Sequence, residues 1–240
     1  MVDTLLRDDT RELRVIMSES SDPAVNLSLE ANLFNCVEEQ RSLNTLLFYV
    51  DSPCLVRGRT HSTSYGWYNE ALASRLGIRV YTRLTGGGVV YHDEGNLNWS
   101  FIIGVKDSFL SPKRVFQEGS KYIVKSLNKL GVKAHYSPPN RIDIDNSKVS
   151  GMAAYSTGRT LLVHGTLLID TDLELLNQLC IPPPGCPKVV NISEHMQIQT
   201  SDVVNIILNT LVEAGFKPQF TDGTEDVCQP IESLRFDKLA

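Results

Sequence analysis

The chain has 240 residues, of which 42% are hydrophobic, and its formal net charge at pH 7 is −5. This size and content suffice for one substantial core, and the acidic balance excludes the basic surface that holds nucleic acid or an anionic membrane. No apolar run approaches the ~18 residues of a membrane helix, the N-terminus is too acidic for a targeting peptide, and the five cysteines form no Cys-x-x-Cys pair. We therefore expect a cytoplasmic protein with one domain over residues 1–220 and a polar tail over residues 221–240.

The first part of the chain alternates strand and helix patterns. Glu12 to Met17 reads as a strand, and a helix follows the Ser-Asp-Pro break at Pro23, with apolar residues at helical spacing. Leu46 to Val50 and Cys54 to Arg57 are β-rich runs joined by Asp-Ser-Pro, a turn-forming trio, which predicts a hairpin. A short helix over Tyr68 to Leu76 then leads into the next strand.

A run of three glycines, Gly86 to Gly88, joins the strand pattern Ile78 to Thr82 to the strand pattern Leu97 to Ile103. Consecutive glycines cost backbone entropy on folding, so their presence indicates positive φ or a close approach of the backbone to a ligand. Unhindered N–H groups in succession form an anion-binding concavity. Arg83 and Thr85, beside the glycines, add a charge and a hydroxyl aimed at a phosphate or carboxylate.

The remaining elements follow in the order helix, two strands, helix, helix. Their expected bounds are Pro112 to Leu130, Lys148 to Tyr155, Leu161 to Asp170, Asp172 to Leu179 and Thr200 to Ala214. No Walker-type Gly-x-x-x-x-Gly-Lys-Ser/Thr occurs, and no Gly-x-Gly-x-x-Gly opens a helix. The common NTPase and dinucleotide-binding patterns are therefore not supported.

Three motifs stand out along the chain. The first is Arg83-Leu-Thr-Gly-Gly-Gly-Val-Val-Tyr-His-Asp, the second is Lys148-Val-Ser-Gly-Met-Ala, and the third is His164-Gly-Thr-Leu-Leu. Together they resemble the signatures of the lipoate-protein ligase A family, which also carries an Asn-x-x-x-Glu like that of Asn26 and Glu30. The resemblance implies an α+β fold of biotin/lipoate protein ligase-like mixed β-sheets flanked by helices.

The resemblance also implies a reaction and the residues that perform it. Lipoate would react with ATP and Mg²⁺ to form lipoyl-AMP, and the lipoyl group would pass to a lysine of an acceptor protein. Lys148 is the expected catalytic residue, because a lysine in a closed pocket can bridge the acyl oxygen and the α-phosphate, and Asp143 is the expected Mg²⁺ ligand. The expected contacts to lipoyl-AMP or ATP are Arg83, Thr85, Gly86, Gly87, Gly88, Val90, Tyr91, His92, Asn96, Ser150, Gly151, His164, Gly165 and Thr166.

The acceptors that the resemblance implies are lipoyl-domain proteins, namely the E2 subunit of 2-oxoacid dehydrogenases and the glycine-cleavage H protein. Many family members carry a small C-terminal domain needed for adenylate formation, and too little chain follows Phe220 to build one. The chain therefore resembles the large subunit of a bipartite ligase, completed by a separate small accessory subunit, or a protein that performs transfer alone. Bacterial members often have an arginine where Tyr155 falls, so one contact to the adenylate is either missing or supplied from elsewhere.

Other functions fit the same residues. An octanoyl- or lipoyl-transferase would carry the acyl group as a thioester, which needs a thiolate near Lys148. Cys180 and Cys186 are available for this role, although the proline neighbours of Cys186 favour a structural one. A non-catalytic protein that binds lipoyl-AMP or lipoate is a further alternative. A biotin protein ligase comes last, because the motifs look like those of the lipoate branch.

Overall fold

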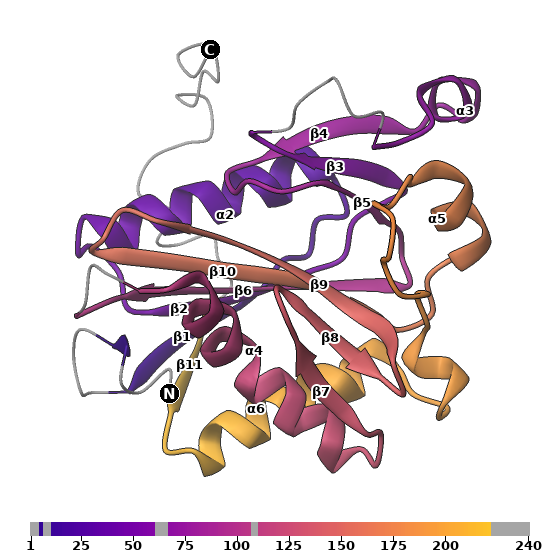
Figure 1. Ribbon diagram of the computed structural model, residues 1–240. Coiled ribbons are helices and arrows are strands. Elements are labelled where there is room, and N and C mark those ends of the chain that lie inside the picture. Colours follow the sequence, from indigo (N-terminus) through magenta and orange to yellow (C-terminus); the bar gives the residue numbers. More distant parts are fainter. Residues whose placement is uncertain (1–4, 7–10, 61–66, 107–109, 222–240) are drawn as a thin grey trace.

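The computed structural model describes residues 5–6, 11–60, 67–106 and 110–221, and it builds them around two β-sheets (Figure 1). The strands of the larger sheet are β1 (Glu12–Met17), β2 (Thr45–Tyr49), β6 (Asn96–Gly104), β7 (Ala134–Ser137), β8 (Arg141–Ile144), β9 (Ser147–Ser156), β10 (Thr160–Leu168) and β11 (Lys217–Thr221). They lie in the order β11-β1-β2-β6-β10-β9-β8-β7. The sheet is mixed, because β1 runs parallel to both of its neighbours and the other pairs are antiparallel.

The smaller sheet consists of β3 (Cys54–Gly58), β4 (Arg79–Arg83) and β5 (Val89–His92) in the order β4-β3-β5. The expected hairpin over residues 46–57 is therefore wrong: β2 lies beside β6 in the larger sheet, and the chain changes sheets before β3. The glycine run joins β4 to β5, which flank β3 on either side. The sequence pattern had indicated that the run leads directly into β6. This expectation is wrong, because β5 lies between them.

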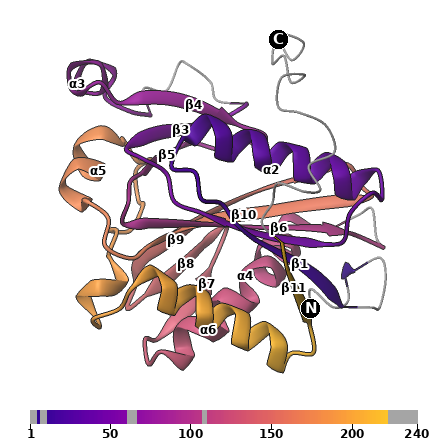
Figure 2. The same cartoon turned by 180° about the vertical axis from the view of Figure 1, so that it is seen from behind.

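Helix α2 (Pro23–Glu38) lies between the two sheets, as both views show (Figures 1 and 2). Asp22 caps its first turn, and a proline occupies its start. One side of α2 packs on the larger sheet through Leu33, Phe34 and Val37. The opposite side brings Leu27 against Cys54 and Val56 of the smaller sheet. Because the helix is covered on two sides, its polar residues Asn26 and Glu30 are buried as well.

Helices α4 (Pro112–Lys129) and α6 (Thr200–Glu213) cover the other face of the larger sheet, below it in Figure 1. Successive side chains of a strand point to opposite faces of its sheet, so β6 contributes residues to both faces of the larger sheet. Leu97, Trp99 and Phe101 enter the main core under α4 and α6. The alternate residues Asn96, Asn98 and Ser100 are buried polar residues on the face toward α2.

Short helices α3 (Glu70–Leu76) and α5 (Leu173–Leu179) and the 3₁₀ turn η2 (Ile192–Glu194) complete the described chain. None of the helices within the described ranges is long and apolar enough to cross a membrane. The expected helices are confirmed within a few residues, whereas β5, β7, β8 and β11 had no strand expectation. The expected polar tail falls almost entirely on residues 222–240, which lie outside the described residues.

Candidate functional site

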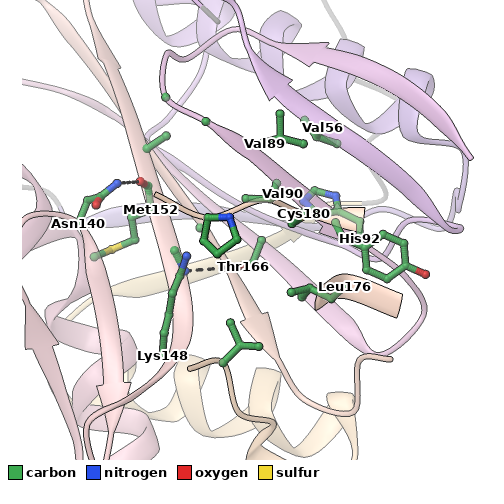
Figure 3. Close-up of a pocket in the computed structure, with 18 of the residues that line it drawn as sticks. Val56, Val89, Val90, His92, Asn140, Lys148, Met152, Thr166, Leu176 and Cys180 are labelled. Atoms are coloured by element: carbon green, nitrogen blue, oxygen red, sulfur yellow. Dashed lines mark hydrogen bonds between the residues drawn. The ribbon is translucent and has the colours of Figure 1, made fainter. Parts of the chain in front are cut away.

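A cavity of about 770 Å³ lies between the smaller sheet and strands β9 and β10. Figure 3 shows Val56, Val90 and His92 on one side of it, and Lys148 and Met152 on the other. The expected site residues that line the cavity are Arg83, Gly86, Gly87, Gly88, Val90, Tyr91, His92, Lys148, Gly151, His164, Gly165 and Thr166. Among the described residues, no Asp or Glu side chain lines it. The cavity therefore suits an anionic ligand with an apolar portion.

The glycine loop is a fixed part of the smaller sheet. Gly87 has a φ of 98°, which side chains rarely tolerate. A Cβ on Gly58 would lie 2.5 Å from the carbonyl carbon of Gly86, so the end of β3 packs directly on the loop. The Gly58 amide also donates to the carbonyl of Gly88 over 3.1 Å. These backbone contacts require glycine at both places and hold the loop against the cavity.

The buried guanidinium of Arg83 holds the glycine loop in place through hydrogen bonds. Its Nε donates to Thr85 Oγ1 at 2.9 Å, Nη1 donates to the carbonyl of Val56 at 3.0 Å, and Nη2 donates to the carbonyl of Gly86 at 2.8 Å. Burial lowers the pKa of Arg83 to about 10, still well above neutral pH. Thr85 does not line the cavity, because its hydroxyl lies between Arg83 and His164.

His164 is held at both ring nitrogens. Nε2 lies 2.8 Å from Thr85 Oγ1, and Nδ1 lies 2.8 Å from Oε1 of Glu30, which also accepts a 2.5 Å hydrogen bond from Ser100. Ser100 and His164 are direct partners in the β6–β10 pairing. Burial alone would raise the pKa of Glu30, but His164, Ser100 and the charge of Arg83 outweigh it, so that pKa lies below its usual value. The network orients His164 and leaves it no free nitrogen.

His92 belongs to a second buried network, which sequence reasoning missed. Its Nδ1 lies 2.8 Å from Asp51 Oδ2, and Asp51 Oδ1 accepts a 2.8 Å hydrogen bond from Asn26. Asp51 was assigned only to a turn, because Asp-Ser-Pro is typical turn chemistry. The signal that could have found it is the pairing of Cys54 with His92 across β3 and β5, which brings the residues before Cys54 close to His92.

The position of Lys148 depends on an irregularity in the sheet. The pairing of β8 with β9 shifts by one residue, which leaves Val149 as the extra residue of a β-bulge. Lys148 and Gly151, three positions apart, therefore share a face, and a Cβ on Gly151 would lie 2.8 Å from Lys148 Nζ. Ser150 falls on the opposite face, and for this reason it is buried away from the cavity.

The ammonium of Lys148 has no hydrogen bond to another side chain in the described part of the chain. Burial lowers its pKa from the ordinary lysine value, although the thiols of Cys186 and Cys180 act in the opposite direction. The backbone of Lys148 is fixed by Lys188, whose carbonyl accepts from the Lys148 amide at 2.7 Å. A partly desolvated cation without a partner is a site for an anion.

Two other expected residues lie behind the cavity wall. Both oxygens of Asp143 accept from Nε of Arg141, at 2.9 and 3.0 Å, so this carboxylate is already paired with a cation, and it does not line the cavity. Asn96 is fully buried and donates to Asn98 Oδ1 at 3.1 Å. Asn98 itself lines the cavity, and its buried Nδ2 has no partner among the described residues. Asn98 is therefore the better candidate for a direct ligand contact.

The cysteines and Tyr155 complete the surroundings. Cys180 and Cys186 both line the cavity, and Cys186 is exposed, in contrast to the structural role that its prolines favoured. Burial raises the pKa of Cys180 to about 12. At Tyr155, where the sequence resemblance implied an arginine, the guanidinium of Arg59 stacks 4.4 Å from the ring centre. A cation from the turn after β3 thus lies beside that position.

A family model described as the lipoyl protein ligase A/B catalytic domain matches residues 22–212. The chain belongs to this family. Lipoate-protein ligase 1 of Staphylococcus aureus is 31% identical over 230 residues, which cover 91% of this chain and 68% of that protein. Lipoate-protein ligase LplJ of Bacillus subtilis is 36% identical over 155 residues, or 64% of this chain and 45% of that protein. The chain thus spans roughly half to two thirds of these relatives.

Solved structures of the same family share the fold. A bipartite lipoate protein ligase from Thermoplasma acidophilum, studied with its E2 lipoyl domain, superposes with a TM-score of 0.77 at 22% identity and covers 90% of this chain and 89% of its own. An ATP-bound lipoate-protein ligase A gives a TM-score of 0.78 at 22% identity, with 90% and 91% covered. The expected α+β fold of the lipoate ligase family is confirmed.

Proposed function

We propose that this lipoate ligase family member activates lipoate with ATP to lipoyl-AMP and transfers the lipoyl group to a lysine of another protein. The observation that carries the proposal is the placement of Lys148 and the glycine loop on the same cavity. The backbone of Gly86 to Gly88 would receive phosphate oxygens, because successive glycine amides favour anions. The ammonium of Lys148 would lie between the acyl oxygen and the α-phosphate, where an anion compensates its burial.

The acyl tail would lie against the apolar part of the wall. Leu27, Val56 and Val90 contribute aliphatic surface there, and Tyr49 adds an aromatic ring. Burial of a methylene contributes about 0.8 kcal/mol, so a chain of several methylenes gains enough to select a medium-length acyl group. Arg83 and His164, on the cavity wall, would support this site through the hydrogen bonds that fix the loop. Mg²⁺, where it accompanies the nucleotide, would neutralise phosphate charge.

The acceptors in this proposal are lipoyl-domain proteins, the E2 subunits of 2-oxoacid dehydrogenases and the glycine-cleavage H protein. A separate small subunit for adenylate formation is part of the proposal, and the bipartite ligase of T. acidophilum, a structural neighbour, supports it. Residues 1–220 would form the catalytic domain. The described cysteines are free thiols, which supports a reducing compartment such as the cytoplasm.

The test supplies ATP, Mg²⁺ and lipoate to the purified chain, with and without a candidate small subunit, and follows lipoyl-AMP and lipoylated acceptor by mass spectrometry. Preformed lipoyl-AMP is supplied in a parallel reaction. We expect lipoylation from preformed lipoyl-AMP by the wild type and a loss of at least about 10²-fold in Lys148→Ala. If the wild-type chain transfers from neither source in the presence of the small subunit, the proposal is wrong.

A second candidate is thioester transfer from an acyl carrier protein, and the exposed position of Cys186 on the cavity favours it. Cys180 is less suitable, because its raised pKa keeps the thiol protonated at neutral pH. Octanoyl-carrier protein without ATP separates the two reactions. Transfer from this donor that is abolished by Cys186→Ser but retained by Cys180→Ser would replace the ligase proposal.

A further inference from the structure

The acceptor in the proposed reaction is a lysine, and its ammonium has no lone pair with which to attack the acyl carbon. An ordinary lysine has a pKa of about 10.4, so at neutral pH it must first lose a proton. A positioned group that accepts such a proton accelerates a reaction by about 10²- to 10⁴-fold. A base on the cavity wall near the site of attack would therefore accelerate the transfer.

Most of the titratable side chains on the cavity wall cannot serve. No carboxylate of the described residues lines the wall. Burial raises the pKa of Tyr49 and of Tyr91 above the ordinary tyrosine range, so both phenols stay protonated at neutral pH. Burial likewise raises the pKa of Cys180, to about 12. These three groups hold their protons under the conditions in which a base is needed.

Two candidates for the base remain once the cationic side chains and His164 are excluded. Lys148 is committed to the anionic ligand in the proposed function. His164 has both ring nitrogens engaged, by Thr85 and by Glu30. His92 and the exposed Cys186 are left.

His92 has the geometry of an oriented base. Its Nδ1 lies 2.8 Å from Asp51 Oδ2, and Asn26 holds the other oxygen of Asp51 at 2.8 Å. Asp51 is fully buried, and a carboxylate only accepts, so Nδ1 carries a proton, and in the neutral ring Nε2 carries the lone pair. No partner of Nε2 occurs within the described ranges, and the ring lies on the cavity wall (Figure 3). A carboxylate behind the ring also stabilises the imidazolium that forms.

The remaining neighbours of His92 do not change this assignment. The donor atoms of Asp51, Cys54 and His92 lie within 4.8 Å of one another. Both oxygens of Asp51 already accept hydrogen bonds, and burial together with the charges of Asp51 and the nearby Asp22 and Asp93 raises the pKa of the Cys54 thiol above its usual range. The protonated thiol and the occupied carboxylate favour a hydrogen-bonded dyad over a bound metal ion.

We propose that His92 is the general base of lipoyl transfer and that Asp51 is its positioning residue, an inference that rests on the proposed function. The acceptor ammonium gives one proton to Nε2, and the freed amine attacks the acyl carbon of lipoyl-AMP. The nitrogen–carbon bond forms, the bond from that carbon to the phosphate oxygen breaks, and AMP leaves with the bonding electron pair. The nitrogen loses its second proton to solvent, and the imidazolium later returns its own proton to solvent.

The test compares two acceptors with preformed lipoyl-AMP: the lysine of a lipoyl domain and hydroxylamine, which is already unprotonated at neutral pH. His92→Asn keeps an N–H donor for Asp51 and removes Nε2. We expect this variant to lose about 10²- to 10³-fold in transfer to lysine and less than about threefold with hydroxylamine, which needs no base. Asp51→Asn should show the same selective loss to a smaller degree, because Asn does not stabilise the imidazolium.

The control is His195→Asn, which alters an exposed histidine outside the cavity and should change neither rate. Equal losses with both acceptors in His92→Asn would assign His92 to binding and overturn the inference. A lysine-selective loss in Cys186→Ser instead, or stoichiometric metal in the purified protein, would also overturn it. A wild-type chain that reacts with neither acceptor refutes the proposed function itself, so the two failures are distinguishable.

Discussion

Gly151 leaves the space that the ammonium of Lys148 occupies, since a Cβ on Gly151 would lie 2.8 Å from Nζ. Nζ ends a flexible side chain, so Gly151→Ala should move the ammonium and spare the backbone. We predict a loss of about 10²-fold in lipoyl transfer, the usual cost of a misplaced reacting group, with a change in unfolding free energy below about 1 kcal/mol. Urea unfolding and transfer rates on one preparation check this. A loss of stability in proportion to activity would contradict it.

Removal of the Lys148 charge should not weaken the fold. Burial lowers the pKa of Lys148 in the folded state, so the unfolded chain binds that proton more tightly. The cost of the buried charge is full below the folded pKa and disappears as the pH rises toward the unfolded value of about 10.4. We predict that Lys148→Met is at least as stable as the wild type at pH 7, loses transfer by at least about 10²-fold, and has a stability advantage that shrinks with rising pH. Denaturant titrations at pH 7 and pH 10 measure both.

Glu30 should contribute stability that acid removes. Its pKa lies below the ordinary value, so the contribution is present above pH ~4.5 and is lost as the pH falls through the folded pKa. We predict that Glu30→Gln lowers the unfolding free energy at pH 7 by about 3 kcal/mol, because it leaves His164 without its carboxylate. The gap to the wild type should narrow below pH 4. Glu19→Gln, at an exposed position, is the control and should show no such gap at either pH.

Gly87 and Gly131 provide a matched pair for the glycine loop. Their φ values are 98° and 93°, and a Cβ on Gly131 would meet nothing within 4 Å, whereas one on Gly87 would lie 3.0 Å from Arg83 Nη2. Alanine at either site should cost about 1–2 kcal/mol of backbone strain. Only Gly87→Ala should also weaken lipoyl-AMP binding, by at least about tenfold. Calorimetric binding and thermal unfolding of both variants test the distinction, and equal affinities would refute it.

Local patterns predicted the helices and long strands well. The apolar face of α2 and the stop at Gly77 each depend on neighbouring residues in the sequence, so the sequence alone indicates them. The partner of each strand in the sheets was harder to predict. Asp-Ser-Pro after β2 is turn chemistry, but it does not tell whether the chain turns back into one sheet or crosses to another. β7 and β11 are short, with burial patterns that do not alternate cleanly, and they become strands by pairing at the two edges of the sheet.

In the site, too, local sequence patterns predicted some features, and others depend on tertiary contacts. Motifs identified the residues around the cavity, but not the direction in which each side chain points. Ser150 belongs to the Lys148 motif and nevertheless turns away, because the bulge at Val149 changes the phase of β9. Asp51 had no motif at all, since its role depends on a contact with His92, 41 residues further along the chain. Such contacts follow only from the tertiary pairing of strands.

Helix α2 supports both histidines of the cavity from adjacent turns. Asn26 holds the carboxylate behind His92, and Glu30, four residues later, holds His164 directly. A small rotation of α2 would therefore displace both imidazole rings together. Substitutions that loosen the packing of Leu33 or Phe34, which do not line the cavity, should impair capture of the adenylate and its discharge together.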